Sequence, residues 1–245
     1  MSATTTVVIP NWNGLVHLEE CLATLREQTL RPTRVIIVDN ASTDDSERFV
    51  RERFPEVEWV QMPENGGFSY AVNEGIRRAD TSYVALLNND TAVEPEWLEQ
   101  LAGALESRPD YAIAASRMVL YYDRHLMNAA GDVYSILRAA GRNRGIFEPR
   151  SAFDEPCRVL GACAGAVLYR RTLFDDIGLF DEDFFLMSED TDINIRALIA
   201  GKKCIYVPTA TVYHKMRATI DSEPSERMML LGARNEAMVA GKDLP

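Results

Sequence analysis

Short hydrophobic runs alternate along the first half of the chain with stretches whose hydrophobic residues recur at helical spacing. Four runs predict buried strands: Val7–Ile9, Val35–Val38, Val57–Val60 and Tyr83–Leu87. Between the first two runs, one face of a helix is formed by Leu15, Leu18, Leu22 and Leu25. Strands that alternate with helices pair in parallel, and uninterrupted hydrophobic strands suit a sheet covered on both faces. The pattern therefore predicts an α/β fold with a Rossmann-like, mostly parallel central sheet flanked by helices.

Two more helices are predicted in this half, and the second half is less regular. Ser42 or Thr43 is suited to cap a helix with an acidic first turn, and Gly66-Gly67 opens another helix. Further on, we expect loops and short strands over 123–156, a helix through Ala200 and a C-terminal helix. The other expected strands are 112–120, 164–170, 204–207 and 211–214. With no internal repeat and no linker, we expect one domain over residues 1–245.

Polar or glycine-rich residues follow the four predicted strands of the first half: Asn11-Trp12-Asn13, Asp39-Asn40, Asn65-Gly66-Gly67 and Asn88-Asn89-Asp90. In parallel sheets, ligands bind at the carboxyl ends of the strands, so these sets are expected to meet along one edge. Asp39 can accept a hydrogen bond from a pyrimidine N–H, or it can be a turn residue. Asp90 is a candidate ligand for Mg²⁺ or Mn²⁺, or a strand-end Asp in a turn. From the residues alone, both alternatives stay open at both positions.

The segment Phe180–Asp192 holds six carboxylates, and three of them fall at the start of a predicted amphipathic helix: Glu189, Asp190 and Asp192. A helix N-terminus stabilises negative charge, so we expect a carboxylate there to stay ionised and basic. Such a group can take the proton of an attacking hydroxyl. The alternative is an acidic first turn that only supports the helix. His214 ends a predicted strand, and a solitary histidine is more often structural than a ligand.

Composition narrows the classes of function. The net charge is −11 and there is no basic run, which argues against a nucleic-acid partner. The four cysteines lack the spacing of a zinc site, as expected for reduced thiols in the cytoplasm. No hydrophobic run approaches the roughly 18 residues that span a bilayer, so membrane contact at its inner face would be peripheral. Neither a G-x-G-x-x-G fingerprint nor a P-loop is present, which disfavours NAD-dependent and P-loop chemistry.

Seven ordered motifs together cover nearly the whole chain. They are Val8 to Asn13, Val38 to Asp44, Glu64 to Phe68 with Asn73 and Gly75, Leu87 to Asp90, Gly161 to Cys163, Phe180 to Asp192, and Val207-Pro208 with His214. Together they resemble the family 2 inverting glycosyltransferases of GT-A fold. The Asn-Asn-Asp form of the fourth motif, with Gly161-Ala162-Cys163 and Phe180-Asp181-Glu182, resembles most the bacterial rhamnosyltransferase-like branch. The resemblance adds a smaller acceptor-side sheet to the predicted fold.

The resemblance also implies a separate role for each half of the chain. Residues 1–120 would bind the nucleotide sugar, and residues 121–245 would bind the acceptor and carry out catalysis. The donor site would be formed by Pro10, Asn11, Asn13, Asp39, Asn40, Asn65, Gly67, Asn73, Asn89 and Asp90. Within it, Asp39 would hold the nucleobase, while Asp90 and His214 would bind Mn²⁺ or Mg²⁺. Asp190 would be the catalytic base, with Glu189 positioning the acceptor.

The activity implied is metal-dependent, inverting transfer of a sugar, with rhamnose favoured. The donor would be a dTDP- or UDP-linked sugar, and the acceptor a hydroxyl of a cell-surface glycan or a polyprenyl-linked molecule. Asn88 and Asn89 stand where many relatives carry aspartates, so the metal site has less charge. A non-catalytic member that binds a nucleotide sugar or glycan is the alternative. A nucleotidyltransferase is disfavoured, because Asn11-Trp12-Asn13-Gly14 replaces the basic, glycine-rich loop that it needs.

Overall fold

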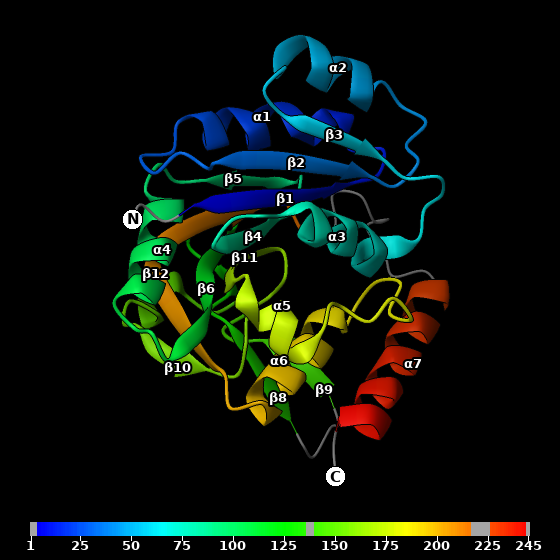
Figure 1. Ribbon diagram of the computed structural model, residues 1–245. Coiled ribbons are helices and arrows are strands. Elements are labelled where there is room, and N and C mark those ends of the chain that lie inside the picture. Colours follow the sequence, from blue (N-terminus) through cyan, green and yellow to red (C-terminus); the bar gives the residue numbers. More distant parts are fainter. Residues whose placement is uncertain (1–3, 136–139, 217–225, 244–245) are drawn as a thin grey trace.

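The computed structural model describes residues 4–135, 140–216 and 226–243 (Figure 1). A ten-stranded sheet runs through the molecule in the order β10-β12-β6-β11-β4-β1-β2-β3, with β5 beside β12 and β7 beside β6. Its four N-terminal strands pair in parallel, as predicted: β1 (Thr5–Asn11), β2 (Arg34–Asp39), β3 (Glu58–Gln61) and β4 (Tyr83–Leu87). The register sets Asn11 opposite Asp39 and Asp39 opposite Gln61, so the polar strand ends do meet at one edge.

Helices cover both faces of the sheet because consecutive strand residues point to opposite sides. Val7 and Ile9 of β1 belong to one core cluster, with residues of α1 (Leu15–Arg26) and α4 (Trp97–Glu106). Val8, between them, belongs to the other, with residues of α3 (Gly67–Arg78), α5 (Thr172–Ile177) and α6 (Glu189–Ile199). The hydrophobic run of this strand was therefore correctly interpreted as buried on both faces.

The second half of the chain extends the same sheet. β11 (Ala166–Arg170) runs antiparallel between β4 and β6 (Tyr111–Leu120), which in turn pairs in parallel with β12 (Lys203–His214). β12 is one strand where two were predicted, with an irregular register between Val207 and Thr211. The short strands are β5 (Thr91–Val93), β7 (Met127–Ala129) and β10 (Cys157–Val159).

A separate two-stranded sheet is formed by β8 (Asp132–Ser135) and β9 (Ala140–Asn143), in keeping with the expected smaller sheet. A short 3₁₀ helix (Arg150–Ala152) follows. The long helix α7 (Glu226–Asp243) lies beside α6 and β9 (Figure 1). Sequence analysis did not predict α4, α5 or β5. The division into a donor half and an acceptor half stays a prediction.

The expected cap of the second helix was wrong. α2 (Ser46–Arg53) begins three residues later than Thr43, and its N-cap residue, Asp45, makes no side-chain capping bond. Ser42 instead donates its hydroxyl hydrogen to Oδ1 of Asp39, at 2.5 Å. The serine that was expected to start a helix therefore belongs to the polar edge of the sheet.

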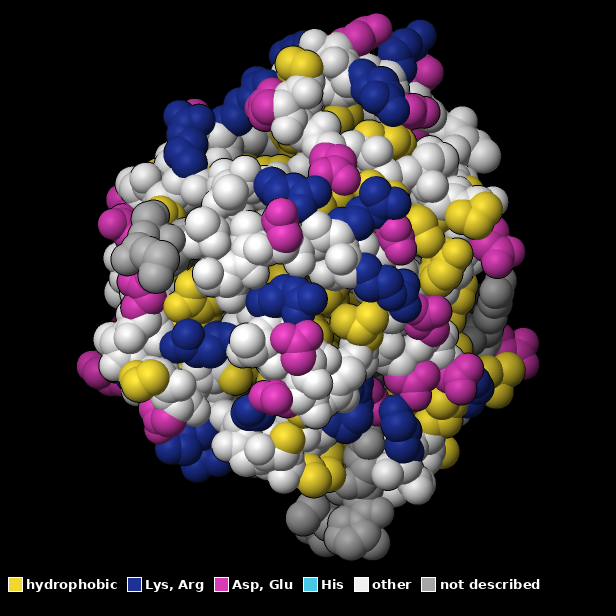
Figure 2. Space-filling view, viewed as in Figure 1, with side chains coloured by type: hydrophobic (Ala, Val, Ile, Leu, Met, Phe, Trp, Pro, Cys, Tyr) yellow, Lys and Arg dark blue, Asp and Glu magenta, His cyan; other side chains and the backbone are white. Residues whose placement is uncertain are grey.

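The surface carries both signs of charge. On the face shown in Figure 2, Lys and Arg side chains are interspersed with Asp and Glu. Many are in ion pairs, such as Arg26 with Glu56 at 2.6 Å and Arg34 with Glu58 at 2.6 Å. Exposed pairs of this kind each contribute little to stability. Within the described part of the chain, no helix is both long enough and apolar enough to cross a membrane.

The contact between α3 and β1 leaves no room for a side chain at Gly75. A Cβ atom there would lie 2.2 Å from Cγ1 of Val8, which is fully buried. We expect Gly75→Ala to lower the free energy of unfolding by about 1–3 kcal/mol, because overpacking displaces neighbouring atoms. Gly103→Ala in α4 is the matched control, since nothing lies within 4 Å of its added Cβ. Gly103→Ala should leave the free energy of unfolding unchanged or raise it by up to about 1 kcal/mol. Equal midpoints of urea unfolding for both variants would show that Gly75 is not packed tightly against Val8.

Candidate active site

A chain of buried side-chain hydrogen bonds connects three strand ends. Nδ2 of Asn89 donates to Oδ1 of Asn11, at 2.8 Å, and Nδ2 of Asn11 donates to Oδ1 of Asp39, also at 2.8 Å. Because Asp39 can only accept, it fixes which way the Asn11 amide points, and the Asn11 oxygen then faces residue 89. A carboxylate at position 89 would place two acceptors face to face. The asparagine at this position therefore fits Asn11, as an aspartate would not.

Asp39 is fully buried, and both of its oxygens already accept hydrogen bonds. Oδ1 accepts from Asn11 and Ser42, while Oδ2 accepts from the backbone N–H of Ser42 (2.8 Å) and from Nε2 of Gln61 (2.9 Å). A nucleobase N–H would have to share or replace one of these donors. Gln61, at the end of β3, is the exposed one. Sequence analysis missed this glutamine, which has no motif to mark it.

The remaining predicted donor residues near this edge hold the loops in place. The backbone N–H of Asn13 donates to Oγ of Ser42 at 2.8 Å, and Nδ2 of Asn40 donates to the Gly67 carbonyl at 3.0 Å. Oδ1 of Asn65 accepts the Gly67 N–H at 3.1 Å. Pro10 is half-buried in β1, opposite Val38. These contacts join the predicted loops into one surface.

Gly67 and Asn73 connect the first half of the chain to the acidic segment. Gly67 has φ +89°, and a Cβ there would lie 2.1 Å from the carbonyl oxygen of Phe185. Asn73 is buried in α3 and exchanges two hydrogen bonds with the backbone of Phe180, of 2.8 and 3.0 Å. The structure thus places Asn73 in the contact between α3 and the acidic segment and does not bring it into the Asn11–Asp39 cluster.

Asp90 and His214 form a buried pair, with Oδ1 of Asp90 3.2 Å from Nε2 of His214. The imidazole is oriented by Asn128 of β7, whose Oδ1 lies 2.8 Å from Nδ1, while its Nδ2 donates to the sulfur of Met216. Nδ1 therefore carries the hydrogen, and Nε2 faces Asp90 with either a proton or a lone pair. Burial by itself would raise the pKa of Asp90, but His214, together with His17 and a backbone N–H, outweighs burial, so the pKa is lowered.

This pair has the donor set of a divalent cation site. A carboxylate oxygen and an imidazole nitrogen that carries a lone pair repel each other unless a proton or a cation lies between them. Within residues 4–135, 140–216 and 226–243, no cluster of three or more His, Cys, Asp or Glu side chains is arranged to hold a metal. The pair alone would supply two ligands, so a cation here would need others from the substrate.

Glu189 and Asp190 open α6, as predicted, after the left-handed residues Met187 and Ser188. Oδ1 of Asp190 accepts the Thr191 N–H at 2.8 Å, and Asp190 remains partly exposed. The expectation that the helix N-terminus keeps a carboxylate easily ionised was wrong for Glu189. Burial and the charge of Asp190 raise the pKa of Glu189 to about 8, and burial raises the pKa of Asp190 despite its backbone hydrogen bonds.

Asp190 also lies close to the end of β4. The backbone of Ala164 is near enough to lower the pKa of the Asp190 carboxyl group, and the next residue, Gly165, accepts the N–H of Asn88 at 2.9 Å. The third acid of the helix start, Asp192, does not join it. Asp192 is fully buried and pairs with Arg196 at 2.5 Å, so it stabilises the helix. The structure therefore brings Asp190, and not Asp192, toward the strand ends.

Helix α7 holds the acidic segment from the other side. Nδ2 of the buried Asn235 donates to the carbonyls of Leu186 (2.9 Å) and Met187 (2.7 Å). Lys242 bridges Asp181 and Asp192, at 2.7 Å each. These contacts fix the backbone just before Glu189. Sequence analysis did not identify these residues, because the helix carries no recognisable motif.

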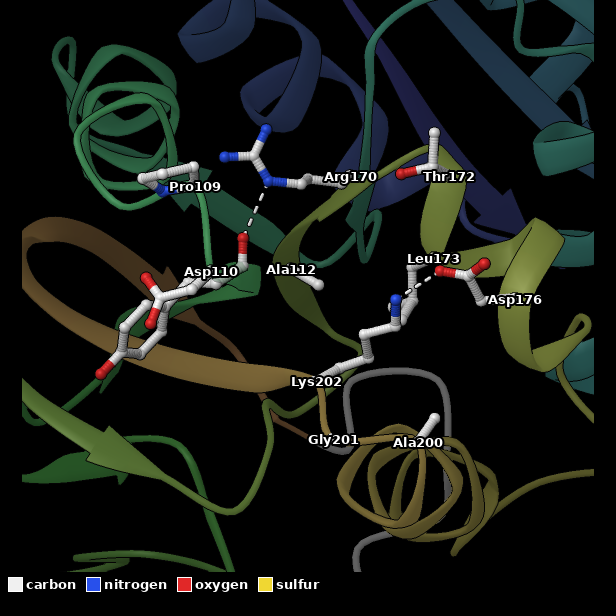
Figure 3. A pocket seen from close by; sticks show the side chains of 11 residues that line it. Pro109, Asp110, Ala112, Arg170, Thr172, Leu173, Asp176, Ala200, Gly201 and Lys202 are labelled. Carbon is white, nitrogen blue, oxygen red and sulfur yellow. Dashed lines mark hydrogen bonds and ion pairs between the residues drawn. The ribbon is translucent and has the colours of Figure 1, made fainter.

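A cavity of about 320 Å³ lies away from these residues (Figure 3). It adjoins Arg170, which pairs in the sheet with Tyr83, the first residue of β4, so it lies at the opposite end of that strand from Asp90. Its charged groups are already engaged. Nε of Arg170 donates to the Tyr111 carbonyl at 2.8 Å, and Lys202 pairs with Asp176. The cavity is therefore not part of the candidate site.

The fold and the residues at the strand ends define the class of the protein: it has a GT-A fold and is a glycosyltransferase. The chain belongs to glycosyl transferase family 2, whose sequence model matches residues 6–178. The matched range includes every predicted donor residue and ends before Glu189, Asp190 and His214.

Two proteins of Mycobacterium tuberculosis are similar in sequence. The N-acetylglucosaminyl-diphospho-decaprenol L-rhamnosyltransferase is 29% identical over 244 residues, which cover 91% of this chain and 79% of the relative. The pre-mycofactocin glycosyltransferase is 29% identical over 217 residues, which cover 88% of this chain and 43% of the relative. The first alignment is long enough in both proteins to compare their whole architecture.

Solved structures share the fold at lower identity. GalNAc-T7 with UDP, GalNAc and Mn²⁺ superposes with a TM-score of 0.77 at 16% identity, over 98% of this chain and 48% of that one. S. aureus TarS 1-349 in complex with UDP gives a TM-score of 0.66 at 17% identity, over 98% of this chain and 66% of that one. This chain thus spans about half the length of the first structure.

The raised pKa of Glu189 gives a stability prediction. The folded protein holds this proton up to about pH 8, whereas the ordinary value is 4.5, so stability falls as the pH rises between these values. Glu189→Gln stays neutral. We expect it to be more stable than the native protein above pH 8, and we expect the difference to vanish below pH 4.5.

Thermal unfolding at a series of pH values measures this effect. Glu236→Gln, an exposed position on α7, is the control and should match the native protein throughout. A melting-temperature difference for Glu189→Gln that does not change with pH would show that Glu189 does not hold a proton of raised pKa.

Proposed function

We propose that this glycosyltransferase inverts the anomeric configuration of a sugar that it moves from a nucleoside diphosphate to a hydroxyl group. The observation that carries the proposal is the buried Asp90–His214 pair, which lies beside the strand ends with its imidazole oriented by Asn128. A base that accepts the hydroxyl proton and attack from the opposite face of the sugar account for inversion in a single displacement. Asp190 is the proposed base, and Glu189 helps to position the acceptor.

The donor would lie along the edge formed by Asn11, Asp39 and Asn89, with Gln61 beside the base-binding position. Buried amide and carboxylate groups that are already oriented lower the entropic cost of binding a polar ligand. Asp39 would accept the N–H of a pyrimidine in place of the exposed Gln61, so uridine and thymidine diphosphates are the favoured donors. The similarity to the M. tuberculosis rhamnosyltransferase favours a dTDP-linked deoxysugar and an acceptor attached to a polyprenyl diphosphate.

Asp90 and His214 would hold a divalent cation, Mn²⁺ or Mg²⁺, together with diphosphate oxygens. Bound there, the cation would stabilise the negative charge that develops on the departing diphosphate. Of the chain's own residues, Asn128 keeps Nε2 of His214 directed at Asp90, and Asp90 keeps a low pKa. The GalNAc-T7 structure contains Mn²⁺ with UDP, which supports this part of the proposal. We further propose a cytoplasmic protein that meets its acceptor at the inner face of the membrane.

Binding of the donor can be tested without knowledge of the acceptor. Titration calorimetry with dTDP, UDP and GDP, with Mn²⁺ and again with a chelator, should show metal-dependent binding of a pyrimidine nucleotide. Asp90→Ala and His214→Ala should each weaken that binding about tenfold or more, because each removes a ligand. His125→Ala, in an exposed turn, is the control. Failure of every nucleotide to bind in the presence of metal would refute the donor site.

The role of Asp190 is tested by an isosteric change. Asp190→Asn should lower kcat by about 10²–10⁴-fold, because the base is lost, and leave nucleotide binding unchanged. Asp183→Asn, an exposed position in the same segment, should stay within about twofold of the native rate. A normal rate for Asp190→Asn would mean that another group removes the proton. A native protein that binds nucleotide and transfers no sugar to any acceptor would instead favour a binding function.

A further inference from the structure

Two buried carboxyl oxygens have no hydrogen-bond partner among the described residues: Oδ1 of Asp132 in β8 and Oε2 of Glu189 at the start of α6. Asp132 has no part in the function proposed so far. It lies in β8 and is 4% exposed. We refer to Asp132, Glu189 and Asp190 as the carboxyl cluster, because the charges of the two α6 residues both act on Asp132.

Asp132 is attached to α6 by Asn194, one helical turn after Asp190. Oδ2 of Asp132 accepts Nδ2–H of Asn194 at 2.9 Å. Asn194 is held in turn by the backbone of Ala162, through one bond of 3.0 Å and one of 3.2 Å. The N–H of Asp132 donates to the Gly161 carbonyl at 2.9 Å, and a Cβ at Gly161 would lie 1.9 Å from Cγ of Asn194. Asp132 therefore has a fixed position relative to the first turn of α6.

The distribution of hydrogen-bond donors shows which member of the cluster carries charge. Asp190 is partly exposed and accepts backbone N–H groups, including that of Thr191 at 2.8 Å. Asp132 receives one donor and keeps one bare, buried oxygen, an arrangement that strongly disfavours a charged carboxylate. A proton on Oδ1 removes that cost.

The electrostatic surroundings of Asp132 favour the same protonation state, although the hydrogen bond from Asn194 by itself lowers its pKa. Burial and the charge of Asp190 raise its pKa well above 3.8, and Glu189 adds to the effect. The charge of Asp132 would also act on Cys163, just before β11, on Tyr169 of β11 and on Cys204 of β12. Burial raises the pKa of each of these groups, which keeps them neutral. None of the groups that act on Asp132 in the described part of the chain is a cation.

We propose that Asp132 is a positioning residue that stays protonated, holds the first turn of α6 through Asn194, and leaves Asp190 as the charged member of the carboxyl cluster. The catalytic part of this inference rests on the proposed function, in which Asp190 is the base. The charge of Asp190 acts on Asp132, so a second charge on Asp132 would compete with that of Asp190. A neutral Asp132 still accepts the hydrogen bond from Asn194 and adds no second negative charge near Asp190.

Infrared spectroscopy tests the protonation state directly and does not depend on any activity. The native protein at neutral pH should show the carbonyl band of protonated carboxyl groups, and Asp132→Asn should remove part of it. Asp183→Asn, the exposed control, should leave the band unchanged. An identical band in the native protein and Asp132→Asn would overturn the proposal.

Kinetics test the positioning role. Asp132→Asn keeps an acceptor for Asn194 and is neutral, so kcat should stay within about threefold of native. The acid limb of its pH–rate profile should not move, because no charge has been removed. Asp132→Ala removes the acceptor and should lower kcat about tenfold, with the nucleotide Kd unchanged.

The outcomes separate this inference from the proposed function. A shift of the acid limb to lower pH in Asp132→Asn would mean that a charge next to Asp190 was removed, so Asp132 is ionised and the inference is wrong. Loss of activity in Asp132→Asn equal to that in Asp132→Ala would also overturn it. If the native protein transfers no sugar, the proposed function fails, and the infrared comparison still decides whether Asp132 is protonated.

Discussion

A carboxyl group cannot stay charged inside a protein unless neighbouring groups compensate the charge, and this site buries several of them. Each is compensated in a different way. Asp39 has four hydrogen-bond donors, and Asp192 has the charges of Arg196 and Lys242. Asp90 faces Nε2 of His214, which compensates its charge when that nitrogen carries a proton and needs a cation between them when it does not. The manner of compensation separates groups that support the structure from groups that remain available to a ligand.

The same reasoning explains the start of α6. Its helix N-terminus favours negative charge, but only Asp190 combines hydrogen-bond donors with access to solvent. Glu189, beside it, is more deeply buried, and the charge of Asp190 adds to the effect of burial on its pKa. The surrounding contacts hold the segment rigidly, from Gly67 on one side and from Asn235 on the other. A carboxylate that is both accessible and held in place would meet the geometric requirement for a general base.

The strands and the polar edge could be predicted from the sequence because both depend on local pattern. Hydrophobic runs identified β1 to β4, and the rule for parallel sheets brought Asn11 and Asp39 together. Contacts between distant segments could not be predicted in this way. Asn73 binds the backbone of Phe180, 107 residues away, and nothing in the local sequence indicates that partner. The expectation of an easily ionised Glu189 failed for a related reason, since burial is a property of the tertiary structure.

The short segment from Asn128 to Asp132 shows how the two halves of the site depend on each other. Both residues are buried, and they lie four positions apart on a part of the chain interpreted from sequence only as loops and short strands. Asn128 orients His214 beside Asp90, and Asp132 anchors α6 through Asn194. A displacement of this segment would move both the imidazole and the helix start. The position of the Asp90–His214 pair relative to the start of α6 therefore depends on β7 and β8, as well as on the long strands of the central sheet.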